Sequence, residues 1–254
     1  MIYYFSGTGN SRAVAQQLSE LLHEEMSDMS GKNWNDQSHA AIIGFVFPVH
    51  AWGLPREVER FIRTMEDVPL SYCFAVLTCG DDCGLAAEGL SSLLRQQHVR
   101  LHYAASVVMP NTYVSFPFFD TDNSDLTARK LQEAPRRLLS IAESISARRS
   151  GFSSVHRGSF PWLKSRLLRP IFRRLLATPR HFSVTAGCIR CGRCAAICPL
   201  GNISQSGSRP VHSKHCTDCL ACYHVCPRHA IAFTCFTRGK GQYLHPQIAA
   251  SFRK

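Results

Sequence analysis

The sequence predicts an α/β protein in which a doubly wound parallel sheet of five strands is followed by a small, cysteine-rich second domain. Continuous apolar runs alternate with amphipathic helical patterns, which is typical of a parallel sheet covered on both faces. A loop of glycine and hydroxyl residues directly follows the first run, and two copies of a four-cysteine pattern lie near the C-terminus. With 254 residues and 45% hydrophobic content, the chain can form one large domain or two modest ones.

The first part of the chain contains the strand and helix patterns in alternation. The apolar runs predict strands over residues 1–5, 26–30, 40–47, 71–78 and 101–109. Helical periodicity predicts helices over residues 11–25, 55–66 and 85–97. A further helix is expected over residues 123–147, where Pro135 favours a kink or a break near Ala134.

Charge is spread unevenly along the chain. The net charge is +11, and residues 144–254 contain 18 Lys and Arg against a single acid, Asp218. A basic half is typical of proteins that contact nucleic acid, an anionic membrane or an acidic partner. Bound anionic cofactors would offset part of this charge. Because no nucleic-acid motif or basic groove with interleaved aromatics is present, we do not expect nucleic-acid binding.

The sequence also indicates a compartment. It shows no run of 18 uncharged apolar residues and no signal-type leader, so we expect a cytoplasmic protein. In that reducing environment, 12 cysteines indicate metal binding or redox chemistry rather than a disulfide framework.

Three loops follow the carboxyl ends of predicted strands, which is where a doubly wound sheet binds its ligand. The first, "SGTGNS" over residues 6–11, places backbone N–H groups and hydroxyls before a helix N-terminus. It lacks the third glycine of the dinucleotide fingerprint and the lysine of the P-loop, so it suits a terminal phosphate; an unoccupied glycine turn is the alternative. The other two loops are "PVHAWGLP" over residues 48–55 and "CGDDCG" over residues 79–84.

These loops and their context resemble those of flavodoxins, which bind flavin mononucleotide (FMN). The resemblance implies that the first loop binds the phosphate, that Trp52 or its neighbours stack on the isoalloxazine ring, and that residues 78–80 contact its pyrimidine edge. Trp52 as an ordinary aromatic is the alternative, and His50 fits a plain loop histidine better than a general acid. The implied cofactor-binding residues are Ser6, Gly7, Thr8, Gly9, Asn10, Ser11, Pro48, Val49, His50, Ala51, Trp52, Gly53, Thr78, Cys79, Gly80 and Gly84.

The segments "CIRCGRCAAICP" (188–199) and "CTDCLACYHVCP" (216–227) repeat the pattern C-x-x-C-x-x-C-x-x-x-C-P. A [4Fe–4S] cubane needs four thiolates, and one such loop can supply three of them. The pattern resembles that of bacterial-type two-cluster ferredoxins, small α+β domains, over residues 183–235. The resemblance implies that one cluster is held by Cys188, Cys191, Cys194 and Cys226, and the other by Cys198, Cys216, Cys219 and Cys222. Zinc is the alternative metal, which the third cysteine and the trailing proline of each copy disfavour.

Four cysteines lie outside the two repeats. Cys73 and Cys235 are predicted to be core residues of strands. Cys79 and Cys83 lie four residues apart in the third loop, where they could form a redox pair beside the flavin. Because the neighbouring aspartates raise thiol pKa values, we expect an inactive pair.

A basic connector is expected over residues 149–182, between a first domain of residues 1–148 and a ferredoxin-like domain of residues 183–235. Residues 236–254 form the C-terminal tail. Apolar residues recur in the connector at helical spacing, which favours two short helices that pack this stripe onto the domains. Membrane attachment through residues 160–177 and docking of an acidic partner are the alternatives. The stripe comprises Trp162, Leu163, Leu167, Leu168, Ile171, Phe172, Leu175 and Leu176.

Taken together, the two parts resemble the flavodoxin/ferredoxin fusion proteins of anaerobic bacteria and archaea, with matches at "YFSGTGNS", "FPVHAWGLP", "MPNTY" and the cysteine repeats. The resemblance implies FMN and two [4Fe–4S] clusters as cofactors, and electron transfer with redox protein partners as the function. The alternative is a flavin-dependent reductase of a small molecule such as a quinone or a nitro compound. In that case the loop 110–120 would form one wall of a substrate pocket. We expect instead that this loop contacts the isoalloxazine ring or the small domain. No catalytic residue is assigned.

Overall fold

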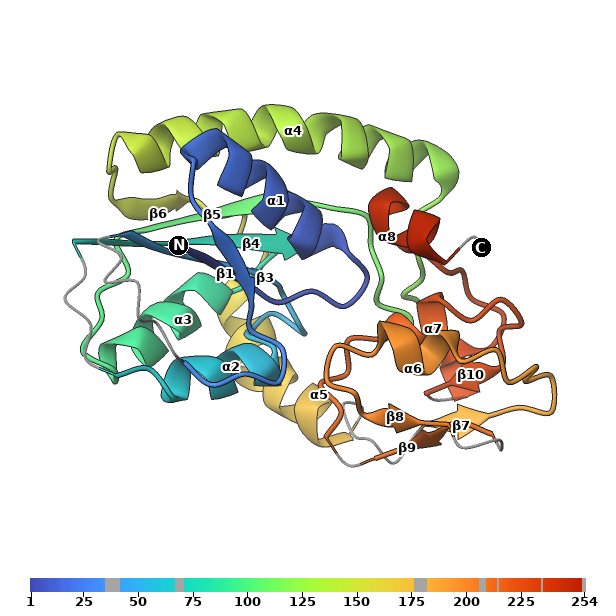
Figure 1. The fold of residues 1–254 in the computed structure, drawn as a ribbon. Coiled ribbons are helices and arrows are strands. Elements are labelled where there is room, and N and C mark those ends of the chain that lie inside the picture. Colours follow the sequence, from blue (N-terminus) through green and yellow to red (C-terminus); the bar gives the residue numbers. More distant parts are fainter. Residues whose placement is uncertain are drawn as a thin grey trace.

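The computed structural model describes residues 1–34, 42–66, 71–175, 182–205, 209–213, 215–233 and 235–252. Its larger part is a parallel sheet with the strand order β2-β1-β3-β4-β5-β6 (Figure 1). The doubly wound α/β class is confirmed, and each of the five expected strands is found; residues 40–41 of the expected third strand lie outside the described residues. The strands are β1 (Ile2–Tyr4), β2 (Met26–Asp28), β3 (Ile42–Pro48), β4 (Tyr72–Cys79), β5 (Tyr103–Val108) and β6 (Gly151–Ser154).

The sixth strand was not expected from the sequence. The segment "GFSS" has no apolar run, and it becomes a strand because β5 offers it a free edge, where Gly151 pairs with Tyr103 and Ser154 with Ala105. The sheet domain therefore extends past the expected boundary at residue 148.

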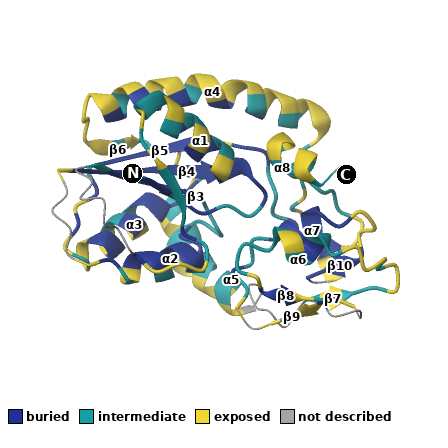
Figure 2. Ribbon diagram, viewed as in Figure 1, coloured by how far each residue is buried: buried dark blue, intermediate teal, exposed yellow. Residues whose placement is uncertain are grey.

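Helices cover both faces of the sheet (Figure 1). On one face α1 (Asn10–Leu22) packs beside α4 (Ser124–Ser146), and on the other face lie α2 (Arg56–Arg63) and α3 (Ala86–Arg95). The strands between them are buried on both sides, which explains their continuous apolar sequences (Figure 2).

The expected break at Pro135 is absent, because α4 runs through this residue as one helix. Pro135 is exposed, whereas Ala134 and Leu138 face the sheet. A proline on the solvent side leaves the unpaired carbonyl one turn earlier open to water, so the buried face keeps its contacts.

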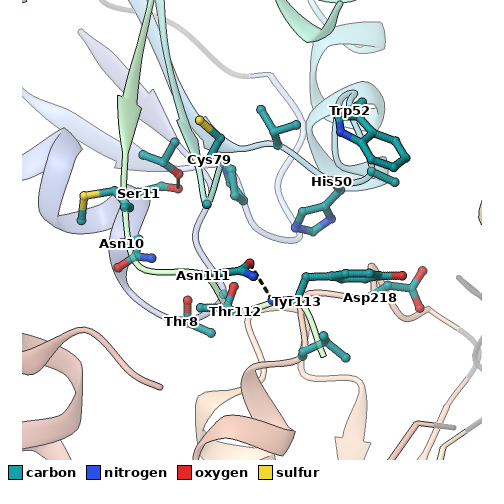
Figure 3. A pocket seen from close by; sticks show the side chains of 18 of the residues that line it. Thr8, Asn10, Ser11, His50, Trp52, Cys79, Asn111, Thr112, Tyr113 and Asp218 are labelled. Carbon is teal, nitrogen blue, oxygen red and sulfur yellow. Dashed lines mark hydrogen bonds between the residues drawn. The ribbon is translucent and has the colours of Figure 1, made fainter. Parts of the chain in front are cut away.

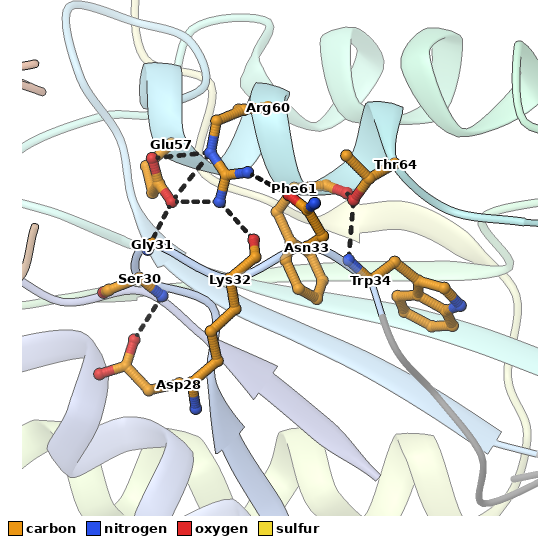
Figure 4. A network of polar contacts seen from close by, with 10 residues as sticks. All are labelled: Asp28, Ser30, Gly31, Lys32, Asn33, Trp34, Glu57, Arg60, Phe61 and Thr64. Carbon is orange, nitrogen blue, oxygen red and sulfur yellow. Dashed lines mark hydrogen bonds and ion pairs between the residues drawn. The ribbon is translucent and has the colours of Figure 1, made fainter.

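A polar network fastens the segment after β2 to helix α2 (Figure 4). The buried carboxylate of Glu57 accepts hydrogen bonds from the backbone of Gly31, at 2.8 Å, and from the guanidinium of Arg60, at 2.7 Å. Trp34 donates its backbone N–H to the Thr64 hydroxyl at 2.8 Å. None of these residues lines the cavity described below, so we assign the network a structural role.

The second domain is built from two small antiparallel pairs of strands and two short helices. The strand β7 (Ser183–Val184) pairs with β10 (Ile231–Ala232), and β8 (Ile203–Ser204) pairs with β9 (Val211–His212). The helices α6 (Arg193–Ile197) and α7 (Ala221–His224) each carry cysteines of one repeat. This is the small α+β domain that was expected.

Cys73 and Cys235, the two cysteines predicted to lie in strands, differ in their burial. Cys73 is fully buried in β4, as predicted. Cys235 was also predicted to lie in the core, and this is wrong: β10 ends at Ala232, and Cys235 is the exposed first residue of a 3-10 helix, Cys235–Thr237. The last helix, α8 (Pro246–Ser251), returns to the sheet domain (Figure 1).

The connector forms a π-helix, Leu163–Leu168, that continues into α5 (Arg169–Leu175). Its expected apolar packing is largely wrong: Trp162, Leu163, Leu167 and Ile171 are exposed, and Leu176 lies outside the described residues. Among the described residues, no helix has both the length and the apolar character needed to cross a bilayer.

Candidate functional site

A cavity of about 360 Å³ lies at the carboxyl edge of the sheet, beside the point where the winding reverses between β1 and β3. Its volume falls in the range of small-molecule and cofactor sites. The three loops singled out in the sequence meet there, and most of the residues predicted to bind cofactor line it. These are Ser6, Gly7, Thr8, Asn10, Ser11, Pro48, Val49, His50, Ala51, Trp52, Thr78, Cys79 and Gly80.

Three glycines from the predicted set do not line the cavity; instead they allow close packing around it. A Cβ on Gly53 would come within 2.0 Å of Arg169 Nε, and one on Gly84 would come within 2.5 Å of Ser165 Oγ, so both sit against the connector. A Cβ on Gly9 would come within 2.5 Å of the Ile248 side chain.

The loop after β1 has the architecture of an anion site. It leads into α1, whose first N–H groups have no partner within the helix. Gly9 caps the helix with φ = 100°, a conformation that favours glycine. The side chains of Asn10 and Ser11 serve to fix the loop: Asn10 donates to Pro110 O at 3.0 Å, and Ser11 lies 2.8 Å from the Thr78 hydroxyl. The first N–H groups of α1 and the hydroxyls of Ser6 and Thr8 therefore remain as candidate donors toward an anion.

A tight turn at residues 50–53 presents His50 to the cavity. His50 and Gly53 exchange backbone hydrogen bonds, while Ala51 and Trp52 both adopt left-handed conformations, with φ of 45° and 57°. Backbone strain of this kind in non-glycine residues occurs where a site fixes the chain. Burial lowers the pKa of His50 to about 4, and Arg169 adds to this effect, so the imidazole is neutral at pH 7. A neutral ring fits the expectation of a loop histidine.

The aromatic walls come from different segments (Figure 3). Trp52 packs edge-on against Phe172 of the connector, with ring centroids 5.5 Å apart, and Lys164 Nζ lies 5.8 Å from its ring centre. Tyr113 faces the cavity beside Asp218, and burial together with this carboxylate raises the Tyr113 pKa to about 12. The phenol therefore stays protonated and can donate a hydrogen bond.

A buried ion pair sets the loop after β5 in place. Lys130 Nζ lies 2.6 Å from Asp122 Oδ2 and donates to Gly80 O at 2.8 Å, while Asp122 also accepts the backbone N–H of Asn111. This pair fixes two cavity loops relative to each other. No local pattern of residues indicates this ion pair, because the four residues belong to three separate segments.

The small domain forms one wall of the cavity, through Thr217, Asp218 and Leu220. The contact is close, since a Cβ added to Gly7 would come within 2.7 Å of Cys219 Cβ. The loop 110–120 belongs partly to the small domain, because Val114 is fully buried in that domain's apolar core. The expectation that this loop contacts the small domain is confirmed.

The eight repeat cysteines surround two separate cavities in the small domain, four to each. One is lined by Cys188, Cys191, Cys194 and Cys226, and the other by Cys198, Cys216, Cys219 and Cys222. This is the exchange of the fourth cysteine that the resemblance implied. Across the described residues, no three His, Cys, Asp or Glu side chains converge closely enough to hold a single metal ion.

The environment of these thiols fits a cationic cluster core. Burial raises the pKa of Cys216 and of Cys219 to about 12, so a thiolate forms there only when a metal supplies positive charge. Backbone N–H groups point at three of the sulfurs: Asn202 to Cys198 at 3.3 Å, Asp218 to Cys216 at 3.3 Å, and Ala230 to Cys226 at 3.2 Å. Such bonds stabilise negative charge on ligating sulfur.

Cys79 and Cys83 are both buried, and Cys79 Sγ donates a hydrogen bond to Asp81 O at 3.7 Å. The neighbouring Cys83 thiol and burial raise the pKa of Cys79 well above its ordinary value, and the two neighbouring aspartates add to the effect. The cause is thus broader than the aspartates that the sequence suggested.

The C-terminal tail contacts the loop of residues 6–11, called the phosphate loop below, and the sequence did not indicate this contact. Tyr243 Oη donates to Asn10 Oδ1 at 3.0 Å, and the backbone N–H of His245 donates to Thr8 O at 2.9 Å. Tyr243 also donates its backbone N–H to His224 Nδ1 at 3.2 Å, next to the cluster cysteines. The tail therefore links the small domain to the phosphate loop.

The sheet order, the anion loop and the two four-cysteine cavities define a redox protein of the flavodoxin class that carries an iron–sulfur module. Family models support this: residues 1–108 match the flavodoxin domain, and residues 182–227 match the 4Fe-4S dicluster domain. The chain is therefore a fusion of a flavodoxin domain and a 4Fe-4S dicluster domain, which implies a flavin and iron–sulfur chemistry.

Solved structures with similar folds have low sequence identity. A flavodoxin from Streptococcus pneumonia is 16% identical, with 57% of this chain and 96% of that chain covered and a TM-score of 0.41. A putative flavoprotein from Bacteroides uniformis is 13% identical, covering 42% and 88%, with a TM-score of 0.39. The two-electron reduced flavodoxin of Megasphaera elsdenii is 17% identical, covering 53% and 98%, with a TM-score of 0.36. No curated protein matches the sequence.

Proposed function

We propose that this protein is an electron relay that connects an outside redox protein, through two [4Fe–4S] clusters, to FMN. Bound flavin accepts one or two electrons, whereas iron–sulfur clusters carry one at a time, so the pair joins one-electron carriers to two-electron chemistry. The observation that carries the proposal is that the Thr217–Leu220 segment, which holds Cys219, forms a wall of the cavity at the phosphate loop.

The residues present fit both cofactors. The N-terminus of α1 and the hydroxyl-rich loop would bind the phosphate, and the turn at 50–53 with Tyr113 and Gly80 would surround the ring. Each four-thiol cavity matches the ligand set of one cubane. A small substrate would share this cavity with the cofactor and the small domain, which favours the relay over the reductase.

The burial of the cysteines supports an order for the relay. Cys191 is exposed, so the cavity with Cys188, Cys194 and Cys226 is the one nearer to a docking partner. Cys219 belongs to the other cavity and touches the phosphate loop. We place the first set at the entry and the second next to the flavin, with electrons able to flow in either direction.

The cysteine chemistry also supports the cellular setting that we propose. None of the 12 cysteines is paired in a disulfide, which fits the reducing cytoplasm that thiolate ligands need. We also propose an anaerobic setting, because oxygen degrades solvent-accessible [4Fe–4S] clusters and Cys191 is exposed.

The test is an anaerobic spectrum with chemical analysis of flavin, iron and sulfide. The eight ligands predict about one FMN and about eight irons per chain. Zinc in place of iron, or protein without flavin, would contradict the proposal.

A second measurement separates relay from reductase. Flavin reduction by a reduced ferredoxin should slow strongly in Cys191→Ser, while the flavin content stays unchanged. Rapid, saturable turnover of a quinone or nitro compound, with flavin reduction unaffected by Cys191→Ser, would instead identify a small-molecule reductase.

A further inference from the structure

The connector helix is inverted relative to an ordinary surface helix. Three of its basic side chains face the sheet domain: Lys164 forms an ion pair with Asp82 at 2.5 Å, and Arg169 and Arg173 both bind Glu59, each at 2.9 Å. A surface helix normally turns its charges toward water and its apolar stripe toward the core. Here the ion pairs hold the helix, so Trp162, Leu167 and Ile171 of the apolar stripe are turned outward, whereas Phe172 packs inward against Trp52.

The outward face carries large apolar side chains. Exposed residues recur at positions 162, 163, 166, 167, 170, 171 and 174, which is the spacing of one helix face. Trp162 is 66% exposed, Leu167 is 52% exposed and Ile171 is 47% exposed, while Phe160, just before the helix, is 75% exposed (Figure 2). Large exposed apolar side chains that recur along one helix face are typical of an interaction site.

The same face is cationic. Arg166 and Arg174 are exposed on it, and neither has an ion-pair partner within the described ranges. Residues 144–175 contain no acid. A face that combines Trp, Phe and Leu with arginine has the composition of a helix that lies in a membrane interface.

We propose that the outward face of residues 160–174 docks the protein on an anionic lipid surface. Its apolar side chains enter the boundary of the acyl chains, and Arg166 and Arg174 bind lipid phosphates. Charge complementarity favours lipid over a second copy of this chain, because a two-fold interface would bring the same arginines of both copies together. The proposal does not depend on the electron relay.

The test uses the full protein with its cofactors, kept free of oxygen and mixed with vesicles. We expect co-sedimentation with phosphatidylglycerol vesicles and little with phosphatidylcholine vesicles. The double variant Arg166→Gln with Arg174→Gln should weaken binding by about tenfold or more, because each juxtamembrane arginine contributes to attraction by anionic lipid. Trp162→Ser with Leu167→Ser should abolish it.

The matched control is Leu139→Ser, which removes a 50% exposed leucine from α4 on the opposite side of the molecule (Figure 1). It should bind vesicles like the parent protein, and all variants should retain their flavin and iron, which shows that they fold. Arg173 is left intact because it holds Glu59.

Three results would overturn the proposal: no binding to phosphatidylglycerol vesicles, equal binding to both lipids, or binding that the two double variants leave unchanged. Sedimentation velocity without lipid is the further check. A dimer that the Leu167 double variant dissociates would show that a second copy covers the face, and would also overturn the proposal.

Discussion

Gly7 of the phosphate loop lies against Cys219, and the two are so close that a Cβ on Gly7 would stand 2.7 Å from Cys219 Cβ. Cys219 is one of the four thiols around the inner cavity of the small domain. The absence of a side chain at Gly7 therefore allows the two domains to contact each other at this point.

Gly7→Ala is predicted to push the two domains apart. Overpacking of this kind costs about 1–3 kcal/mol. We expect lower thermal stability and slower flavin reduction through the clusters, measured by calorimetry and stopped-flow absorbance. The control is Gly89→Ala in α3, where a new Cβ meets no atom within 4 Å. If Gly7→Ala behaves like Gly89→Ala, the contact does not position the domains.

Tyr243→Phe is predicted to weaken flavin binding without unfolding the protein. The change removes the hydrogen bond to Asn10 Oδ1, which ties the tail to the phosphate loop. A hydrogen bond of this kind contributes about 1 kcal/mol, so the Kd for FMN should rise about fivefold, as fluorescence titration would measure. The control is Tyr72→Phe, which removes the bond to Arg149 O away from the cavity and should leave the Kd unchanged. Equal Kd values for Tyr243→Phe and the parent protein would exclude this role of the tail.

His50 is predicted to make the apoprotein less stable as the pH falls. Burial holds its folded-state pKa at about 4, below its ordinary value of 6.5. Between these two pH values His50 is protonated in the unfolded chain and neutral in the folded chain. This contribution is complete above pH 6.5 and is lost as the pH falls toward 4. Between pH 7 and pH 5 the loss is about 2 kcal/mol.

Urea unfolding at several pH values, monitored through the fluorescence of buried Trp34, would measure this loss of stability. His50→Gln should show a smaller loss of stability over the same pH range. An identical pH dependence in both proteins would mean that His50 is not held neutral by burial.

Cys235 is predicted to react faster than Cys79 with a thiol-labelling reagent. Cys235 is exposed, whereas Cys79 is buried and its pKa is raised by the neighbouring Cys83 thiol and by burial. With iodoacetamide at pH 8, peptide mass spectrometry should find Cys235 modified first and Cys79 protected. Cys235→Ser should remove the fast reaction. A disulfide between Cys79 and Cys83 in air-oxidised protein would instead show an active pair.

The sequence alone determined the local chemistry of this protein. The alternation of apolar runs specified the parallel sheet, and the loop of residues 6–11 specified an anion site, because both depend on neighbours along the chain. Spacing within each cysteine repeat grouped three thiols, and the family resemblance supplied the exchanged fourth, which the structure places as expected.

Only the tertiary structure decided how these parts meet. Asn10 and Tyr243 are 233 residues apart, yet they share a hydrogen bond at the phosphate loop. The strand β6 forms because β5 has an open edge, and the connector turns its apolar side outward because Glu59 and Asp82 hold its basic side. Such outcomes depend on partners that packing brings together over long distances in the chain, and no local pattern of residues records them.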